Sequence, residues 1–503
     1  MPPPDAPPFL PRPPHFARQA RSMVRNMSEH AFFACLTDPA RRYPLDQPIY
    51  RCPATNDLLD LTYHWDRLPV PPDLRWFDRR HASRRHPLDF SGVWRFRELM
   101  PFVREEHIVT IGEGQTILQR NDRIARCIGL RPGDLHLQYE GLNPTGSFKD
   151  NGMTAGVSFA RALGRQRVAC ASTGNTSASM ACFAAAAGMQ AIVFIGEGKI
   201  ALGKLSQALD YGALTLQVAG DFDACLARVQ QAAQRLSLYL LNSLNAARLE
   251  GQKAIMYRVL EALDWEVPDW IVVPGGNLGN SASFGKAFLE LRQLGLVRRV
   301  PRLAIINAAG ADTLHRLYNQ RGVRWHDGQI HPAEQLHAEY HAMEQPTPYK
   351  ARTVASAIEI GRPVNLPKAL RALAVMNGSS DTSTGSEGVV ASVDDDCILR
   401  HRALIARWGF GCEPASAASL AGVQQLVSGG VIMPGERVVC ILTGHELKDP
   451  TATVNFHYGL PPASPEGAAA SQSLPRSLLE RLANRPVKVV NDLDAICAAL
   501  GAT

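Results

Sequence analysis

Short apolar stretches alternate with longer helical segments through the central part of this chain. The apolar stretches occupy residues 167–171, 191–195, 215–218, 238–241, 270–273, 303–306 and 437–442, and 134–140 form a strand by period-two alternation. Helical patterns separate most of them, for example over residues 150–163. This order predicts an α/β fold with open, mostly parallel sheets covered by helices. Such sheets bind ligands at the loops that follow the carboxyl ends of their strands.

The two ends of the chain have a different pattern. Residues before about Thr110 lack a regular period and are rich in Pro, Arg and His, so an irregular N-terminal segment is expected. Residues 1–30 are Pro-rich and basic, which is typical of a disordered leader. Residues 461–475 have the composition of a linker. Beyond them we expect a helix, a strand over 487–490 and a final helix, in a tail apolar enough to dock on the main body.

Composition and charge argue against two classes of partner, nucleic acids and membranes. The chain has 503 residues, of which 46% are hydrophobic and 20% are charged, as in ordinary globular proteins. A formal net charge of +6 is mild at this length, and no nucleic-acid motif accompanies it, so no nucleic-acid partner is expected. No apolar stretch is long enough to span a bilayer, so no membrane partner is expected either.

The ten cysteines are scattered without a C-x-x-C pair. Buried free thiols in a reducing compartment fit this spacing better than a disulfide framework. An Arg-rich, acid-poor stretch over residues 16–27 is a faint sign of an import peptide, but we expect a cytoplasmic protein.

The first chemical candidate is the lysine of the octapeptide NPTGSFKD, Lys149, which opens a helix after a Gly/Ser turn. A helix N-terminus disfavours an ammonium group, and desolvation lowers the pKa of a lysine further. The neutral amine is the form that attacks an aldehyde. The alternative is an ordinary surface lysine at the start of a helix.

Two loops between a strand and a helix are suited to anions. PGGNLGN at 274–280 has three glycines, which let the backbone wrap closely around a phosphate. STGNTS at 172–177 exposes backbone N–H groups beside small hydroxyls, although plain N-capping would also explain it.

Two further motifs offer polar groups at strand ends. Thr443 in LTGHELK presents a neutral hydroxyl, which suits an unprotonated pyridine nitrogen, although it could simply cap the next helix. Arg248 in NSLNAARLEGQK can bind a dianionic phosphate through paired hydrogen bonds, although a surface arginine is the alternative. Together the five motifs can surround one cofactor and one anionic substrate.

These motifs carry a family resemblance. The strings NPTGSFKD, STGNTSAS, GDFDACL, NSLNAARLEGQK, PGGNLGN, CEPASAA and LTGHELKDP together resemble the threonine synthases, in the tryptophan-synthase-β class of pyridoxal-phosphate enzymes. The resemblance runs from about residue 91 to residue 450. It implies a fold type II architecture, with a large α/β domain from 111–149 and 242–460 and a small α/β domain from 150–241. The segment 31–110, the linker 461–475 and the tail 476–503 would flank these domains.

The resemblance also implies roles for individual residues. Lys149 would be the catalytic residue that holds pyridoxal 5'-phosphate as a Schiff base and shuttles protons. The other cofactor-binding residues would be Asn175, Gly275, Gly276, Asn277, Leu278, Gly279, Asn280 and Thr443. The substrate-phosphate residues would be Ser172, Thr176, Asn242, Ser243 and Arg248. The implied reaction converts O-phospho-L-homoserine and water to L-threonine and phosphate, in a homodimer.

Some positions depart from the family pattern. Gln115, Ile117, Asn151 and Glu446 replace residues that are usually Asn, Pro, Arg and Gly, which puts substrate positioning in doubt rather than the cofactor. Many relatives carry a cysteine-pair ribbon near the N-terminus, but Cys52 lacks its second cysteine, so no zinc or other metal is expected.

Three alternatives stay open at this point. Amino-acid dehydratases and cysteine synthases share the fold but need no second phosphate clamp. Cysteate synthase would share the clamp and accept O-phosphoserine, which has a shorter carbon chain. An inactive paralogue acting as a binding subunit is a third alternative, against which the presence of Lys149 argues.

Overall fold

The structure is a computed structural model, and it describes residues 29–81, 83, 85–196, 202–218, 235–236, 238–343, 350–379, 386–460 and 482–500. The leader up to residue 28, the GDFDACL motif at 220–226 and the linker at 461–475 lie outside the described residues. Among the described helices, none combines the length and the apolar character needed to cross a bilayer.

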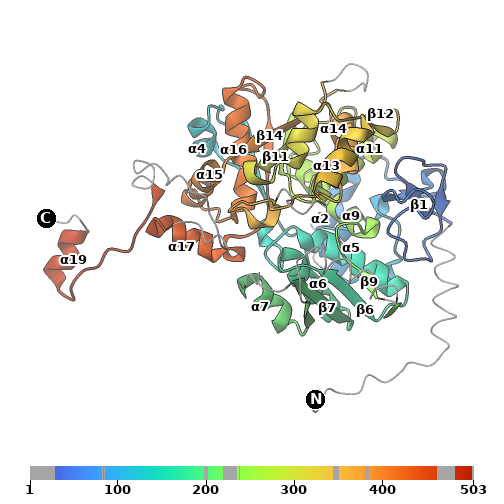
Figure 1. The fold of residues 1–503 in the computed structure, drawn as a ribbon, viewed down its shortest axis with the longest axis horizontal. Helices are drawn as coiled ribbons and strands as arrows, with labels where there is room; N and C mark the ends of the chain where they lie inside the picture. The colour runs from blue at the N-terminus through green and yellow to red at the C-terminus, as the bar shows by residue number, and fades with distance from the viewer. Residues whose placement is uncertain are drawn as a thin grey trace, which may run out of the picture.

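A six-stranded sheet forms the core of the larger part of the molecule (Figure 1). Its order is β14 (Val389–Val393), β11 (Arg302–Ala308), β10 (Trp270–Pro274), β15 (Val438–Leu442), β5 (Leu135–Tyr139) and β4 (Ile117–Arg120). Neighbouring strands are parallel except for β4, which is antiparallel to β5. Strands β10 and β15 are buried at every position, which explains why they are continuous apolar runs.

A four-stranded parallel sheet forms the second α/β layer. Its order is β8 (Leu214–Val218), β7 (Gln190–Gly196), β6 (Arg167–Ala171) and β9 (Tyr239–Leu240). Figure 1 shows it below the larger sheet, with α5 and α9 between them. The prediction of mostly parallel sheets covered by helices is therefore confirmed.

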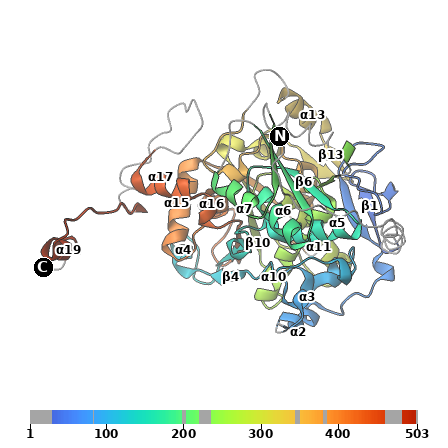
Figure 2. The same cartoon turned by 90° about the horizontal axis from the view of Figure 1, so that it is seen from below.

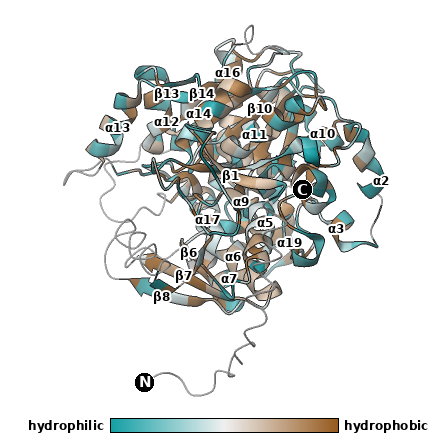
Figure 3. Cartoon of the chain, turned by 90° about the vertical axis from the view of Figure 1, so that its right-hand side faces the viewer, coloured by the Kyte–Doolittle hydropathy of each residue, from teal (hydrophilic) through white to brown (hydrophobic). Residues whose placement is uncertain are grey.

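The helices that carry or cover the site are α4 (Asp122–Cys127), α5 (Lys149–Ala162), α6 (Asn175–Ala186), α7 (Leu202–Asp210), α9 (Ala246–Gln252), α10 (Ala254–Ala262), α11 (Gly279–Gln293), α14 (Leu366–Val375), α15 (Asp395–Arg407) and α16 (Pro414–Ser428). Helix α13 (Ala333–Ala342) and the short α2 (Asp78–His81) lie at the periphery, where Figure 3 shows α2 as hydrophilic.

The N-terminal segment is not irregular, contrary to expectation. It contains an antiparallel sheet in the order β2 (Arg42–Tyr43), β1 (Ala31–Cys35), β3 (Leu59–Tyr63). Strand β1 is buried at every position, so its sequence AFFAC shows no alternation that would have predicted it. The ring of Phe33 meets that of Phe159 edge-on, which packs this sheet against α5, and Figure 2 shows β1 beside that helix.

The C-terminal tail also differs from expectation. Residues 487–490 form no strand, and only the short helix α19 (Leu493–Ala499) follows them. Val487, Leu493 and Leu500 are largely exposed, and Figure 1 shows α19 away from the main body. Leu482 and Ala483 do pack on the main body, and the N–H of Asn484 donates to His457. The expected docking is therefore found at the start of the tail and not over residues 487–500.

Candidate active site

The five motif loops meet at the carboxyl ends of the two sheets. The N–H of Phe148 donates to the carbonyl of Thr443 at 2.9 Å, and Ser147 pairs with Gly444 in an isolated bridge. Asn365 joins two other loops, because its N–H donates to the carbonyl of Asn277 and its amide donates to the carbonyl of Ser243. The convergence expected from strand-end placement is confirmed.

Lys149 is the first residue of α5 and is partly exposed as a residue, and its amine has no hydrogen-bond or ion-pair partner among the described residues. The amine lies 4.1 Å from the centre of the Phe148 ring. Burial, reinforced by the positive charge of Arg248, lowers the pKa of Lys149 to about 7. At neutral pH a large share of these side chains therefore carries the neutral, nucleophilic amine.

This pKa predicts how the cofactor-free protein captures an aldehyde such as pyridoxal phosphate. The capture rate should rise with pH to about 7 and then level off, because the neutral amine attacks. At pH 7.5 a lysine of this pKa is roughly three quarters neutral, against about one in a thousand for an ordinary lysine. Stopped-flow absorbance across pH 5–10 measures the rate, and a rate still climbing steeply at about pH 10 would contradict the prediction.

The same shift predicts a stability effect of defined sign. The folded-state pKa of Lys149 lies below the ordinary value, so between these two values the unfolded chain binds a proton that the folded chain has released. The contribution of this group to the stability of the cofactor-free protein therefore grows as pH rises from about 7 towards the ordinary lysine value.

The glycine loop after β10 is suited to a phosphate. The backbone N–H groups of residues 277–281 donate to no acceptor that the described part of the chain provides. The hydroxyl of Ser281 and the side-chain oxygen of Asn280 are buried without partners. A Cβ on Gly275 would come within 2.6 Å of the Asn307 amide, so that residue must be glycine for the loop to lie this close. Free N–H groups at the start of a 15-residue helix match a phosphate dianion.

Two further polar groups come from loops of this site. Asn175 begins α6, is buried, and its side-chain oxygen has no partner among the described residues. Thr443 follows β15, and its hydroxyl lies 3.0 Å from that of Ser416. Both side chains offer polar groups that could contact a pyridoxal ring.

Arg248 lies fully buried on α9, and no carboxylate of the described residues pairs with it. One terminal nitrogen donates to the carbonyl of Leu241 at 2.8 Å, while its Nε has no partner in the described residues. Burial lowers the pKa of Arg248 to about 10. Helices α5 and α9 approach closely at glycines: a Cβ on Gly152 would come within 2.9 Å of Arg248, and one on Gly251 within 1.9 Å of the Asn151 carbonyl. This contact sets the guanidinium near Lys149.

The other expected substrate-phosphate residues occupy different environments. Ser172, Thr176 and Ser243 are half-buried at the same edge as Lys149, and the hydroxyl of Ser172 accepts from the N–H of Gly174. The side chain of Asn242 instead pairs with the backbone of Ala171, accepting at 3.2 Å and donating at 3.1 Å. Asn242 therefore extends the pairing of β6 with β9, and only its second amide hydrogen is left for a ligand.

Two family departures are accommodated by neighbours. The Asn151 amide donates to the carboxylate of Glu140 at 2.7 Å, and Arg258 forms an ion pair with the same carboxylate at 2.6 Å. The carboxylate of Glu446 lies over Gly411, where a Cβ would be 2.2 Å from it.

Sequence reasoning missed three residues that shape the site. Glu413 and Ser416 lie in the CEPASAA motif, to which no role was given, and Asn365 lies outside every motif named from the sequence. The carboxylate of Glu413 accepts from Nδ2 of Asn175 at 3.0 and 3.1 Å. The CEPASAA motif precedes a helix and does not follow a predicted strand, so its position in the sequence did not predict a contact with Asn175.

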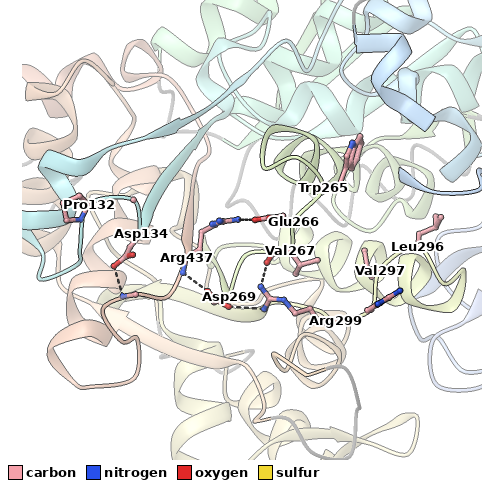
Figure 4. Close-up of a pocket in the computed structure, with 13 residues that line it drawn as sticks. Pro132, Asp134, Trp265, Glu266, Val267, Asp269, Leu296, Val297, Arg299 and Arg437 are labelled. Carbon is pink, nitrogen blue, oxygen red and sulfur yellow. Dashed lines mark hydrogen bonds and ion pairs between the residues drawn. The ribbon is translucent and has the colours of Figure 1, made fainter. Parts of the chain in front are cut away.

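A cavity of about 670 Å³ lies at the opposite edge of the large sheet (Figure 4). Its lining comes from the segments just before β5, β10, β11 and β15. Two of its three arginines are paired with acids: Arg299 with Asp269, and Arg437 with Glu266. None of the expected site residues lines it, so we place the chemistry at the strands' carboxyl ends.

Comparison with known proteins gives consistent matches. The sequence model of a family described as "Pyridoxal-phosphate dependent enzyme" matches residues 109–444. Threonine synthase of Methanocaldococcus jannaschii is 40% identical over 416 residues, which cover 82% of this chain and 92% of that protein. "Threonine synthase 2, chloroplastic" of Arabidopsis thaliana is 33% identical over 484 residues, covering 94% and 85%.

The crystal structure of Escherichia coli threonine synthase superposes with a TM-score of 0.57 at 19% identity, covering 93% of this chain and 99% of that one. At this identity the likeness shows the fold alone.

Proposed function

The chain belongs to the threonine synthase family of pyridoxal-phosphate-dependent enzymes, and from that premise we propose that it converts O-phospho-L-homoserine and water to L-threonine and phosphate. One observation carries the choice of substrate: the guanidinium of Arg248 is buried without an anionic partner among the described residues, and its charge acts on Lys149. A buried guanidinium requires an anion. Because the cofactor's phosphate has its own site, that anion would be a second one, supplied by the substrate.

The cofactor site follows from the groups left without partners. Lys149 would hold pyridoxal phosphate covalently, and the glycine loop with Ser281 would bind its phosphate. Asn175 would contact the ring oxygen, and Thr443 would face the ring nitrogen as a neutral partner. When bound, the cofactor supplies an electron sink next to the substrate's α-carbon.

The protein's own part in the reaction is to hold the substrate and move protons. Arg248, with Ser172, Thr176, Ser243 and the remaining amide hydrogen of Asn242, would hold the substrate phosphate. The amine of Lys149 would remove the proton from Cα, and a proton then leaves Cβ as phosphate departs from Cγ. Water adds at Cβ, and protons return to Cγ and Cα. Because water must be kept out before phosphate departs, closure of the two layers on the substrate is expected.

The test is product analysis with two substrates. Purified protein loaded with pyridoxal phosphate is incubated with O-phosphohomoserine, and phosphate and threonine are quantified together. The proposal predicts equal amounts of both products. O-phosphoserine with sulfite is the parallel arm, and faster phosphate release there would replace the proposal with a cysteate synthase activity. A protein that binds the cofactor and turns over neither substrate would favour an inactive paralogue.

We also propose a reducing compartment, the cytoplasm, and a homodimer. The described cysteines are all free thiols, which supports the first proposal. The homodimer stays a prediction.

A further inference from the structure

Glu413 is a buried carboxylate that the proposed roles above do not use. It lies just before Pro414 at the start of α16 and is 1% exposed. Burying a carboxylate is unfavourable unless hydrogen bonds and charges compensate. Its neighbours therefore indicate what it does.

The first neighbour is Asn175, across the interface between the two sheets. Both carboxylate oxygens of Glu413 accept from Nδ2 of Asn175, at 3.0 and 3.1 Å. Because an ionised carboxylate only accepts hydrogen bonds, the amide nitrogen must face Glu413, which fixes the orientation of the amide. The two oxygens can share one hydrogen, so the second N–H of Asn175 stays available to the cofactor's ring oxygen.

The second neighbour is the backbone at the end of β15. The N–H of Glu413 donates to the carbonyl of Gly444 at 3.0 Å, and a Cβ on Gly444 would come within 2.4 Å of the Glu413 carboxylate. The N–H of Gly444 in turn donates to the hydroxyl of Ser416. Glu413 is thus held rigidly against the segment that carries Thr443.

The same segment also borders the turn that carries Lys149, because Ser147 pairs with Gly444 and the N–H of Phe148 donates to the carbonyl of Thr443. Two charged groups act on the amine of Lys149: Arg248 from α9 disfavours the ammonium, and Glu413 favours it. Asp150, the next residue along α5, turns its carboxylate to Thr145 and Ser179 instead. Among the described residues, Glu413 is therefore the carboxylate that opposes the effect of Arg248 on this amine.

We propose that Glu413 is a positioning residue, which fixes the Asn175 amide with an N–H toward the cofactor's ring oxygen and sets one negative charge opposite Lys149. This rests on the proposed function only in taking Asn175 and Lys149 as cofactor residues. Neither arm of the test below uses phosphohomoserine, so an error in the proposed substrate leaves it intact.

The first arm measures the pKa of Lys149 in the full-length, cofactor-stripped chain by acetic anhydride labelling and mass spectrometry. In Glu413→Gln the midpoint should fall below the wild-type value of about 7, because a favourable negative charge is lost. A merely structural role would open the site and raise the midpoint towards that of an ordinary lysine, and a rise or no change overturns the proposal. Glu387→Gln, which removes a carboxylate paired with Arg324, is the control and should leave the midpoint unchanged.

The second arm uses the holoenzyme and a double-mutant cycle on the dissociation constant of pyridoxal phosphate. Asn175→Ala and Glu413→Gln should each weaken binding several-fold, and the double variant should bind about as weakly as Asn175→Ala alone. Glu413→Gln should also change the absorption spectrum of the bound cofactor, since the amide is free to turn. If the two substitutions reduce the binding free energy of the cofactor additively and leave its absorption spectrum unchanged, Glu413 does not act through Asn175.

Discussion

Replacing Lys149 with alanine should reduce turnover by at least about 10³-fold, because its amine both holds the cofactor and moves the protons. No other buried lysine among the described residues can substitute for it. The amines of Lys253, Lys286, Lys368 and Lys448 are each bound to protein acceptors. The measurement is phosphate release from O-phosphohomoserine under saturating pyridoxal phosphate.

Two controls accompany this variant. Lys488→Ala removes an exposed lysine and should retain full activity. Borohydride reduction followed by mass spectrometry should leave the cofactor on Lys149 in the wild-type chain. Activity of Lys149→Ala within about tenfold of wild type, or a reduced adduct on another lysine, would contradict the assignment.

Replacing Arg248 with methionine, which preserves most of the buried volume, should raise KM for the phosphorylated substrate by at least about 30-fold. The estimate follows from losing hydrogen bonds to a dianion, worth about 2 kcal/mol or more. The same change should leave the thermal stability of the protein equal or higher, because a buried cation without an anionic partner is costly in the free chain. It should also raise the pKa of Lys149, since a neighbouring positive charge is lost.

The control for Arg248 separates binding from structure. Inorganic phosphate should raise the Tm of the wild-type holoenzyme, in which the cofactor's own phosphate site is filled, and not that of Arg248→Met. Arg248→Lys keeps the charge without the paired geometry and should be intermediate in KM. An unchanged KM together with a lower Tm would show that Arg248 supports the fold rather than the substrate.

The sequence predicted the site best where a motif follows a buried strand. Strands such as β10 and β15 are continuous apolar runs that end at the motif, so both the strand and the loop could be located. Lys149 and Arg248 could be named as candidates because their chemistry is unusual for the start of a helix. That they lie near one another depends on the glycine contact between α5 and α9, which no local pattern reveals.

The remaining features depend on tertiary contacts. Strand β4 is an exposed antiparallel edge, so its four residues show no buried pattern. Asn242 was expected to bind phosphate, but its amide pairs with Ala171 once β6 and β9 are adjacent. Glu413 is ordinary in sequence, and its contact with Asn175 joins residues 238 positions apart. An apolar composition in the tail was no guide to docking, because it does not specify a partner surface.

The central claim is that phosphate leaves from Cγ while water adds at the neighbouring carbon, Cβ. Reaction in ¹⁸O-labelled water tests it most directly. Because the Cγ–O bond breaks and water adds at Cβ, the label should appear in the hydroxyl of threonine, and the released phosphate should carry none. Label in the phosphate, with homoserine as the organic product, would show cleavage of the P–O bond and would contradict the account.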